Sequence, residues 1–482
     1  MSLFSWLRHK NSPAVGGAEA CTAMELPEGE TGALDAKPAA AEIDAARLAE
    51  AVERLASDAR LHQLSQWFTR HAREIADFQL AVTAIAAPPF GEQRRAEWLA
   101  EQLSALGLRM EQDEVGNVLA WREGASPREG AGTALSQARA AEEHAAIAIS
   151  AHLDTVFPAG SALPVRRDNA RLLGPGISDN GTGLAALWAL ARGMKECAIT
   201  TSLPLLLVAN VGEEGEGNLR GMRHLYRNEI ARARSGKAAE FDLSAPRIAA
   251  LVVLDGAGCE SITGEALGSR RFEIVFRGPG GHSWSDFGAP NPITAAALAA
   301  AAMARILLPV EPRTTLNVGV IEGGTAVNAI PEEARMRVDI RSTEAAALEA
   351  MEEQLRRVVA EAREEAAALA RRAGERLTAE IRLLDARPAG ELREASPLLA
   401  AARAVDAQLG IRSQLLRAST DANIPLSLGL EALTLGAGGA GGGAHTLQEW
   451  FDPMHRELGL RRVGMLALLL AGLEEKSLEE RR

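Results

Sequence analysis

Cysteine is scarce in this chain of 482 residues, which contains only Cys21, Cys197 and Cys259. The three lie far apart in the sequence, so they match no Cys-x-x-Cys zinc pattern and offer no disulfide framework. This usage is typical of a protein from a reducing compartment, and we therefore expect a cytoplasmic location.

Long apolar runs and an excess of basic residues are also missing. No stretch reaches the ~20 apolar residues of a membrane-spanning helix, and the first ten residues lack the apolar segment and cleavage site of a signal peptide. The formal net charge is -12, which disfavours nucleic acid and anionic membranes, because both bind clustered Lys and Arg. We expect neither as a partner, whereas small molecules and cations suit this charge.

About half of the chain is hydrophobic, which is more than one core usually accommodates and indicates two domains or one domain with a large insertion. Residues 1–42 are rich in Gly, Ala, Pro and Glu without periodicity, and we expect a disordered leader there. Over residues 43–267, helical patterns alternate with strands that are apolar throughout. This alternation predicts an α/β domain with a mostly parallel sheet.

The pattern changes after residue 268. Two helical stretches and four strands of alternating polarity follow in the order β-α-β-β-α-β, which is typical of a ferredoxin-like domain. We expect this second domain to span residues 268–386 and to be inserted into the first, which resumes over residues 387–476.

Histidines and carboxylates follow the ends of the apolar strands and the Gly-rich turns. His152 and Asp154 point the same way at one strand tip, because side chains on a strand repeat every two residues. In open α/β sheets the carboxyl edge of the strands is where ligands bind, so we expect the whole set to converge there. In chain order the set is His152, Asp154, Asp179, Glu213, Glu214, Asp255 and His445.

Carboxylates and imidazoles gathered in one place repel one another unless a cation joins them, and a divalent metal does so. Five of these residues are candidate ligands, and two histidines with three carboxylates are too many for one tetrahedral zinc and suit a pair of metals bridged by a carboxylate. Two metals ~3.5–4 Å apart can polarise a carbonyl and generate hydroxide at neutral pH. We therefore predict two divalent metal ions, with Zn2+ first and Co2+ or Mn2+ as alternatives.

Six motifs, in this order and at these distances, carry a family resemblance. They are Ser150-Ala151-His152-Leu153-Asp154, Gly176-Ile177-Ser178-Asp179-Asn180-Gly181, Gly212-Glu213-Glu214-Gly215, Gly278-Pro279-Gly280-Gly281-His282-Ser283, Asn328-Ala329-Ile330-Pro331 and Gly443-Ala444-His445. The chain resembles the dinuclear zinc exopeptidases and amidohydrolases, which include peptidase T, acetylornithine deacetylase, succinyl-diaminopimelate desuccinylase and glutamate carboxypeptidases. The resemblance runs from about residue 90 to residue 452, and residues 89–92 and 444–450 look most similar to the peptidase T-like branch.

The resemblance implies which residue binds which metal. Asp179 would bridge the two ions. His152 and Asp255 would complete the ligands of one metal, and Glu214 and His445 those of the other.

It also implies the roles of the neighbouring residues. Glu213 would be the general base that takes a proton from the metal-bound water and delivers it to the leaving nitrogen. Asp154 would hydrogen-bond the second ring nitrogen of His152 and so orient it. A cis peptide is expected between Asp179 and Asn180, and Asp179 also fits the simpler role of a helix N-cap.

Three further residues of the resemblance lie in the inserted domain. The histidine at the His282 position reaches the active site of the neighbouring subunit in similar enzymes, so a homodimer through the inserted domain is implied. Arg341 offers a fork for a substrate carboxylate, and Asn328 adds a hydrogen bond. Simpler alternatives are that His282 is a turn residue and that Arg341 pairs with Asp339 or Glu344.

The chain departs from the common family pattern at Asn180, often a second aspartate, and in insertions at residues 123–143 and 223–247. These departures affect the inferred substrate more than the inferred metals. The glycine run 436–443 lacks the Gly-Lys-Ser/Thr ending of a phosphate loop and indicates a close approach of the backbone to the site.

The function that we predict is hydrolysis of the peptide bonds of short peptides by a metal-bridged hydroxide, as in exopeptidases of the aminopeptidase type, with Glu213 as general base. The alternative within the same class is an amidohydrolase that deacylates N-acyl amino acids. A catalytically silent dimeric binding protein is a third interpretation, and the intact ligand set together with Glu213 argues against it.

Overall fold

The computed structural model describes residues 45–125, 145–158, 165–235, 246–372 and 376–474. The predicted leader, residues 1–42, and most of the insertion at residues 123–143 lie outside the described residues. The helices are α1 (Ala45–Ala56), α2 (Ala59–Arg70), α3 (Ala72–Thr83), α4 (Gln93–Ser104), α6 (Gly181–Glu196), α7 (Arg220–Leu225), α8 (Arg227–Ser235), α9 (Pro292–Met303), α10 (Ala345–Ala368), α11 (Pro397–Leu409), α12 (Asn423–Ser427) and α13 (Arg456–Ala471). The strands are β1 (Arg109–Gln112), β2 (Val118–Arg122), β3 (Ala146–His152), β4 (Arg166–Asp168), β5 (Arg171–Leu173), β6 (Leu205–Asn210), β7 (Ile248–Leu254), β8 (Ser261–Ala266), β9 (Gly268–Arg277), β10 (Gly281–His282), β11 (Thr314–Gly323), β12 (Ala329–Ile330), β13 (Glu333–Ser342), β14 (Thr378–Arg387), β15 (Gly390–Glu391), β16 (Gln414–Ala418), β17 (Ala432–Leu435), β18 (Ala440–Gly442) and β19 (Trp450–Asp452).

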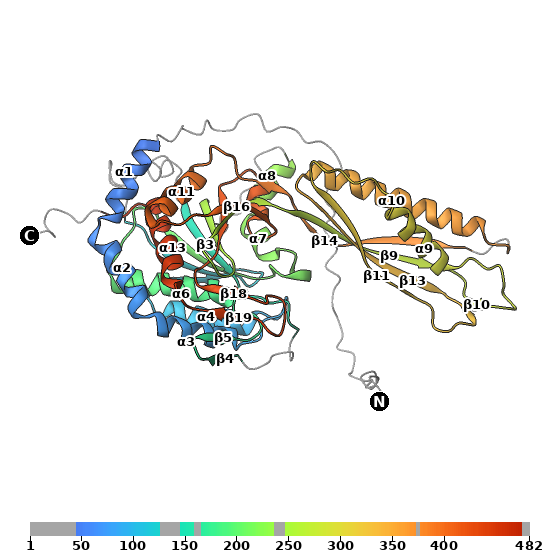
Figure 1. The fold of residues 1–482 in the computed structure, drawn as a ribbon, viewed down its shortest axis with the longest axis horizontal. Coiled ribbons are helices and arrows are strands. Elements are labelled where there is room, and N and C mark those ends of the chain that lie inside the picture. The colour runs from blue at the N-terminus through green and yellow to red at the C-terminus, as the bar shows by residue number, and fades with distance from the viewer. Residues whose placement is uncertain (1–44, 126–144, 159–164, 236–245, 373–375, 475–482) are drawn as a thin grey trace, which may run out of the picture. The chain divides into compact units, whose positions relative to one another are not determined.

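The largest sheet has the strand order β1-β2-β6-β3-β7-β17-β8-β15, with β16 paired to β8 (Figure 1). Its centre is parallel, because β3 pairs in parallel with β6 and β7, and β7 with β17. Towards both edges the pairing is antiparallel, from β6 through β2 to β1 and from β17 through β8 to β15. The predicted α/β class is confirmed, and the parallel pairing is concentrated in the strands that carry the site.

Strand β3 lies at the centre of this sheet, and all seven of its residues are buried. Helices α6 and α13 both pack against it, and five of its seven residues are apolar, with Ser150 and His152 as the exceptions near its carboxyl end. The strand ends at His152, so the polar residues of the site begin where the buried core ends.

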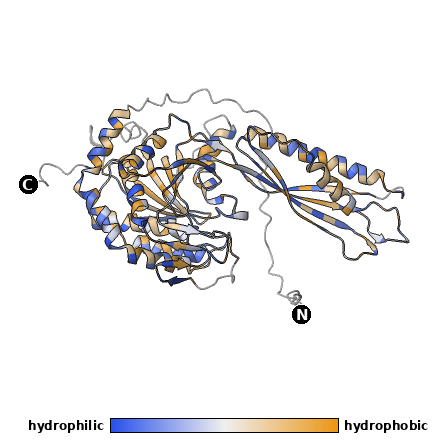
Figure 2. Cartoon of the chain, in the orientation of Figure 1, coloured by the Kyte–Doolittle hydropathy of each residue, from blue (hydrophilic) through white to orange (hydrophobic). Residues whose placement is uncertain are grey.

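The second sheet has the order β11-β13-β9-β14, and every pair in it is antiparallel. With α9 and α10 it forms the predicted β-α-β-β-α-β arrangement and encloses a core of its own. Figure 2 shows the polar and apolar stripes of α10, whose buried residues include Leu355, Val358, Val359 and Ala362. The helical pattern continues to Leu369, but this residue is 63% exposed, because the helix ends at Ala368.

Two stretches that carry a continuous helical pattern in the sequence each form two helices. The helical pattern of residues 61–86 is broken at His71, whose Nδ1 lies 2.9 Å from the Trp67 carbonyl oxygen and whose ring stacks on Trp67. Residues 222–234 are divided at Tyr226 between α7 and α8. A one-residue break leaves the hydrophobic period intact on both sides, so the pattern alone did not reveal it.

The glycine run 436–443 approaches neighbouring backbone closely, as predicted. A Cβ atom on Gly436 would lie 2.5 Å from the carbonyl oxygens of Ala257 and Gly258, and one on Gly441 would lie 2.2 Å from Ser178 Oγ. Larger side chains would push this segment away from the turn that contains Asp179.

Among the described residues, no helix is both long and apolar enough to cross a membrane.

Arg462 of α13 forms a deeply buried ion pair, with Nε and Nη2 each 2.6 Å from a carboxylate oxygen of Asp406 in α11. We expect Arg462→Ala to lower the free energy of unfolding by about 3–5 kcal/mol, because it leaves a buried carboxylate without a partner. Urea unfolding measures the change. Arg363→Ala, which breaks a more exposed pair with Glu364, is the matched control and should change stability little. Equal stability of Arg462→Ala and the parent would contradict this account.

Candidate active site

The residues predicted from the strand ends lie together. His152 is the last residue of β3, Glu213 and Glu214 follow β6, and Asp255 follows β7. Asp179 lies in the turn before α6, and His445 follows β18. Among the described residues, three groups could hold a metal ion, each with ligand atoms within 4.8 Å of one another. They are His152 with Asp179 and Asp255, Asp179 with Glu214 and His445, and His152 with Glu213 and Glu214.

Asp179 belongs to two of these groups and presents a different oxygen to each. Its Oδ1 lies 3.0 Å from Nε2 of His152, and its Oδ2 lies 3.1 Å from Nε2 of His445. On one side Asp255 Oδ1 lies 3.8 Å from the His152 nitrogen, and on the other Glu214 Oε1 lies 3.0 Å from the His445 nitrogen. One carboxylate between two such pairs is the arrangement that a bridging ligand requires.

The charges of the site favour a bound cation. Burial lowers the pKa of His152, but the carboxylates of Asp154, Asp179 and Asp255 outweigh it and raise that pKa well above its usual value. Hydrogen bonds to Asp179 and Glu214 raise the pKa of His445 to about 10. The same negative field that retains protons on these imidazoles would attract divalent metal ions, and carboxylate oxygen with imidazole nitrogen is a ligand set that zinc accepts. The residues therefore fit two such ions.

Asp154 has a broader role than predicted. The Nδ1 atom of His152 lies 3.1 Å from the main-chain carbonyl oxygen of Asp154 and 3.6 Å from its carboxylate Oδ1. The carboxylate itself accepts the backbone N–H groups of Glu213, at 3.0 Å, and Glu214, at 2.7 Å. One buried residue therefore orients both the histidine and the pair of glutamates.

The turn before α6 has the predicted cis peptide between Asp179 and Asn180. The N-cap of α6 is Asn180, whose Oδ1 accepts the N–H of Gly183 at 3.1 Å and whose Nδ2 donates to the carbonyl of Leu254 at 2.8 Å. The simpler interpretation of Asp179 as a helix cap is therefore wrong, and its carboxylate is available to the site.

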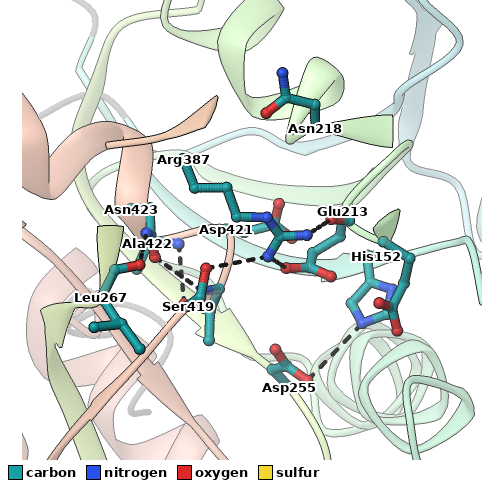
Figure 3. A network of polar contacts seen from close by, with 12 residues as sticks. His152, Glu213, Asn218, Asp255, Leu267, Arg387, Ser419, Asp421, Ala422 and Asn423 are labelled. Atoms are coloured by element: carbon teal, nitrogen blue, oxygen red, sulfur yellow. Dashed lines mark hydrogen bonds and ion pairs between the residues drawn. The ribbon is translucent and has the colours of Figure 1, made fainter. Parts of the chain in front are cut away.

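Glu213 is 5% exposed, and burial raises its pKa well above the usual value, although the nearby charge of Arg387 partly offsets this. Nη1 of Arg387 lies 2.8 Å from Glu213 Oε1 (Figure 3). Nothing in the sequence distinguishes Arg387 from the other charged residues of the alternating strand β14, so its role could not be predicted.

Two buried carboxyl groups were also missed. Glu449 accepts the backbone N–H groups of Gly176, Ser178 and Asp179 at 2.6–2.8 Å, and burial raises its pKa to about 7. Asp421 is fully buried, accepts a hydrogen bond from Asn210 at 2.7 Å, and has its pKa raised to about 7 by burial. Glu449 lies four residues after His445, and that proximity was the one available signal.

The residues predicted in the inserted region are not among these ligand groups. His282 is exposed, its Nδ1 accepts the N–H of Trp284 at 3.2 Å, and Asn328 beside it accepts the N–H of Ser283. Arg341 donates to Asp339 at 2.8 Å. The β13 register places Arg341 opposite Ser269 and Glu333 opposite Arg277, so at ~3.3 Å per residue Arg341 is roughly 26 Å along the strand from the end near His282.

Two protein families match parts of the chain. Residues 134–265 match peptidase family M28, and residues 265–367 match the peptidase dimerisation domain. One curated relative, the uncharacterized protein YqjE of Bacillus subtilis strain 168, is 24% identical over 349 residues, which cover 70% of this chain and 83% of the relative.

Solved structures share the fold at low sequence identity. Aminopeptidase PepT from Bacillus cereus ATCC 10987 has a TM-score of 0.63 and 18% identity, over 83% of this chain and 99% of its own. A hydantoinase/carbamoylase family amidase from Burkholderia vietnamiensis has a TM-score of 0.61 and 18% identity, over 83% and 97%. The YXEP protein of Bacillus subtilis, described as a dinuclear metal binding peptidase from the M20 family, has a TM-score of 0.56 and 16% identity, over 84% and 99%.

The fold, the two partial family matches and the ligand cluster agree with the metal-dependent peptidases and amidohydrolases, so the resemblance carried by the motifs is confirmed. Within this class the chain combines a region that matches peptidase family M28 with a peptidase dimerisation domain. Its structural neighbours include peptidases and amidases, so the fold alone does not distinguish the two activities.

Because Glu449 holds the turn that contains Asp179, we expect Glu449→Gln to weaken metal binding by about 10- to 100-fold, the usual effect of losing a group that supports a ligand. The carboxylate of Glu449 accepts three N–H groups with its two oxygens. The amide of glutamine has only one oxygen that can accept them. Competition with a chromophoric chelator measures the affinity. Gln448→Ala, an exposed neighbour on the same loop, is the control, and equal affinities in the two variants would refute the role.

Proposed function

We propose that this protein is a two-metal exopeptidase that hydrolyses short peptides, with zinc as the metal. The position of Asp179, one of whose oxygens faces each ligand group, is the observation that carries the proposal. His152 and Asp255 would hold one ion, and Glu214 and His445 the other. When bound, two such ions polarise the scissile carbonyl and lower the pKa of a water molecule.

Glu213 performs the proton transfers. Its Oε1 is bound by Arg387, so Oε2 takes the proton of the attacking water and returns it to the leaving nitrogen. Burial favours the neutral form of this carboxyl group and so assists the uptake of the proton, while Arg387 favours the carboxylate and so assists the return of the proton. Asp154 holds the main chain of Glu213 and Glu214, so the base and its neighbouring ligand keep a constant relative position.

A second copy of the chain completes the site in this proposal. His282 in the short strand β10 and Asn328 just before β12 belong to the inserted region and are not among the ligand groups of their own chain, and residues 265–367 match a dimerisation domain. We propose a homodimer in which His282 of one chain stabilises the oxyanion formed in the other, with Asn328 adding a hydrogen bond.

The substrate preference follows from the charged groups of the inserted sheet. Arg341 is paired with Asp339, but its side chain remains 39% exposed. Its guanidinium can therefore also form an ion pair with a substrate carboxylate. A carboxylate on a small amide substrate suits a dipeptide or tripeptide and also an N-acyl amino acid, and amidases occur among the structural neighbours. Deacylation of N-acyl amino acids is therefore the second candidate.

We also propose the regions predicted from the sequence: a catalytic region of residues 43–267 and 387–476 with residues 268–386 inserted. A cytoplasmic location is proposed from the cysteines, since Cys197 and Cys259 are free thiols.

Purified protein should contain close to two metal ions per chain. We also expect metal-dependent peptide hydrolysis when di- and tripeptides are compared with N-acyl amino acids in the presence of zinc, cobalt or manganese. Glu213→Gln should retain the metals and lose about 10²- to 10⁴-fold in kcat, the usual contribution of a general base. Mass spectrometry of the metals and steady-state kinetics measure both. Full activity of a metal-free preparation would exclude the mechanism, and exclusive cleavage of N-acyl amino acids would select the second candidate.

Mixed dimers test the role of His282. A dimer of one His282→Ala chain and one Glu213→Gln chain has one site with both groups intact if the histidine acts across the interface, so we expect up to half of the parent activity. If the histidine acts within its own chain, each site lacks one group and activity stays low. Differently tagged chains, purified by both tags, provide verified heterodimers for this measurement.

A further inference from the structure

Arg387 connects the inserted sheet to the proposed base. It is the last residue of β14, where it pairs with Ser269 of β9, so its main chain belongs to the inserted sheet. Its side chain is 7% exposed and extends to Glu213, which follows β6 of the large sheet. Figure 3 shows the guanidinium of Arg387 beside the Glu213 carboxylate, with Ser419 on its other side.

The guanidinium binds Glu213 at two points. Nη1 donates to the carboxylate Oε1 at 2.8 Å, and Nη2 donates to the main-chain carbonyl oxygen of the same residue. Nη1 also lies 3.2 Å from Ser419 Oγ. Contacts to both the side chain and the main chain restrict the rotation of the Glu213 side chain, which a single contact would leave free.

The main chain around Arg387 is itself held. Nδ2 of Asn423 donates to the carbonyl oxygens of Leu267, at 3.0 Å, and of Pro388, at 2.9 Å. Leu267 precedes β9 and Pro388 follows β14, so one side chain joins both connections between the two sheets, as Figure 3 shows for Leu267. The neighbouring Ala386 carbonyl accepts a hydrogen bond from Arg223. The position from which Arg387 extends is therefore well defined.

Stability alone is a weak reason to bury this pair, because desolvation of two charges commonly cancels their attraction. The pair is also incompletely satisfied, since Nε of Arg387 is buried and has no hydrogen-bond partner among the described residues. What the geometry does provide is direction. Oε1 is bound by Arg387, which leaves Oε2 for proton transfer, and a carboxylate oxygen of Glu213 lies within 4.8 Å of ligand atoms of His152 and Glu214.

We propose that Arg387 is a positioning residue that fixes the Glu213 carboxylate in the orientation needed for proton transfer, so that the end of the inserted sheet determines where the base points. This inference rests on the proposed role of Glu213 as the base. Arg387 touches neither substrate nor metal in this account, and its removal affects the rate of proton transfer more than the binding of either.

The test compares Arg387→Ala and Arg387→Lys with the parent. We expect Arg387→Ala to lower kcat by about 10- to 100-fold, the effect expected of a misplaced catalytic group, with KM and metal content within twofold of the parent. Arg387→Lys should recover part of kcat, because one ammonium can hold Oε1 but not the main-chain carbonyl as well. Added guanidinium ion at low millimolar concentration should raise kcat of the alanine variant and not that of the parent.

Arg271→Ala is the matched control. Arg271 lies two residues from Ser269 on β9 and pairs with Asp339 and Asp385 of the inserted sheet, so its removal also breaks ion pairs there without touching Glu213. We expect kcat close to that of the parent. A parallel loss of kcat in Arg271→Ala and Arg387→Ala would show a general effect on the sheet and would overturn the inference.

Other outcomes separate this inference from the proposed function. The positioning role is overturned if a folded Arg387→Ala chain has the kcat of the parent, or if its kcat falls only in proportion to lost metal. In either case the proposed function still stands if Glu213→Gln is inactive. An active Glu213→Gln chain overturns both. If Arg387→Ala does not fold, the lysine variant decides: a reduced kcat at unchanged KM and metal content supports the role, and an unchanged kcat overturns it.

Discussion

The structure depends on the crowding of negative charge at the carboxyl edge of the central strands. Asp179, Glu214 and Asp255 surround two imidazoles within hydrogen-bonding or ion-pairing distance. Like charges this close are unfavourable without a compensating cation, and the raised pKa values of His152 and His445 are one expression of that field. The surrounding chain has to hold these groups together against their mutual repulsion.

Buried carboxylates hold the main chain of the site at two places. Asp154 accepts the N–H groups of Glu213 and Glu214, and Glu449 accepts those of the turn that contains Asp179. In both cases the acceptor fixes backbone, so the ligand side chains above it start from defined positions. The strand β3 provides the rigid base for this arrangement, because all seven of its residues are buried.

Much of the site could be predicted because its residues follow local patterns. An apolar run that ends in His152, or a glycine before Glu213, is visible in a short stretch of sequence, and parallel strands bring such ends to one edge. The breaks at His71 and Tyr226 could not be predicted in this way, since they leave the helical period undisturbed. Arg387 was missed because its importance comes from a residue 174 positions away.

By itself the sequence determined the class of fold, the regions of apolar strand and the residues at the strand tips, because periodicity and the chemistry of metal ligands act over short distances. Tertiary structure decided which carboxylate lies between the two ligand groups, that Asp154 supports the glutamate pair as well as His152, and that Arg387 reaches Glu213. These contacts join segments far apart in the chain, and their geometry depends on how the two sheets are connected at Asn423. No local pattern records that connection.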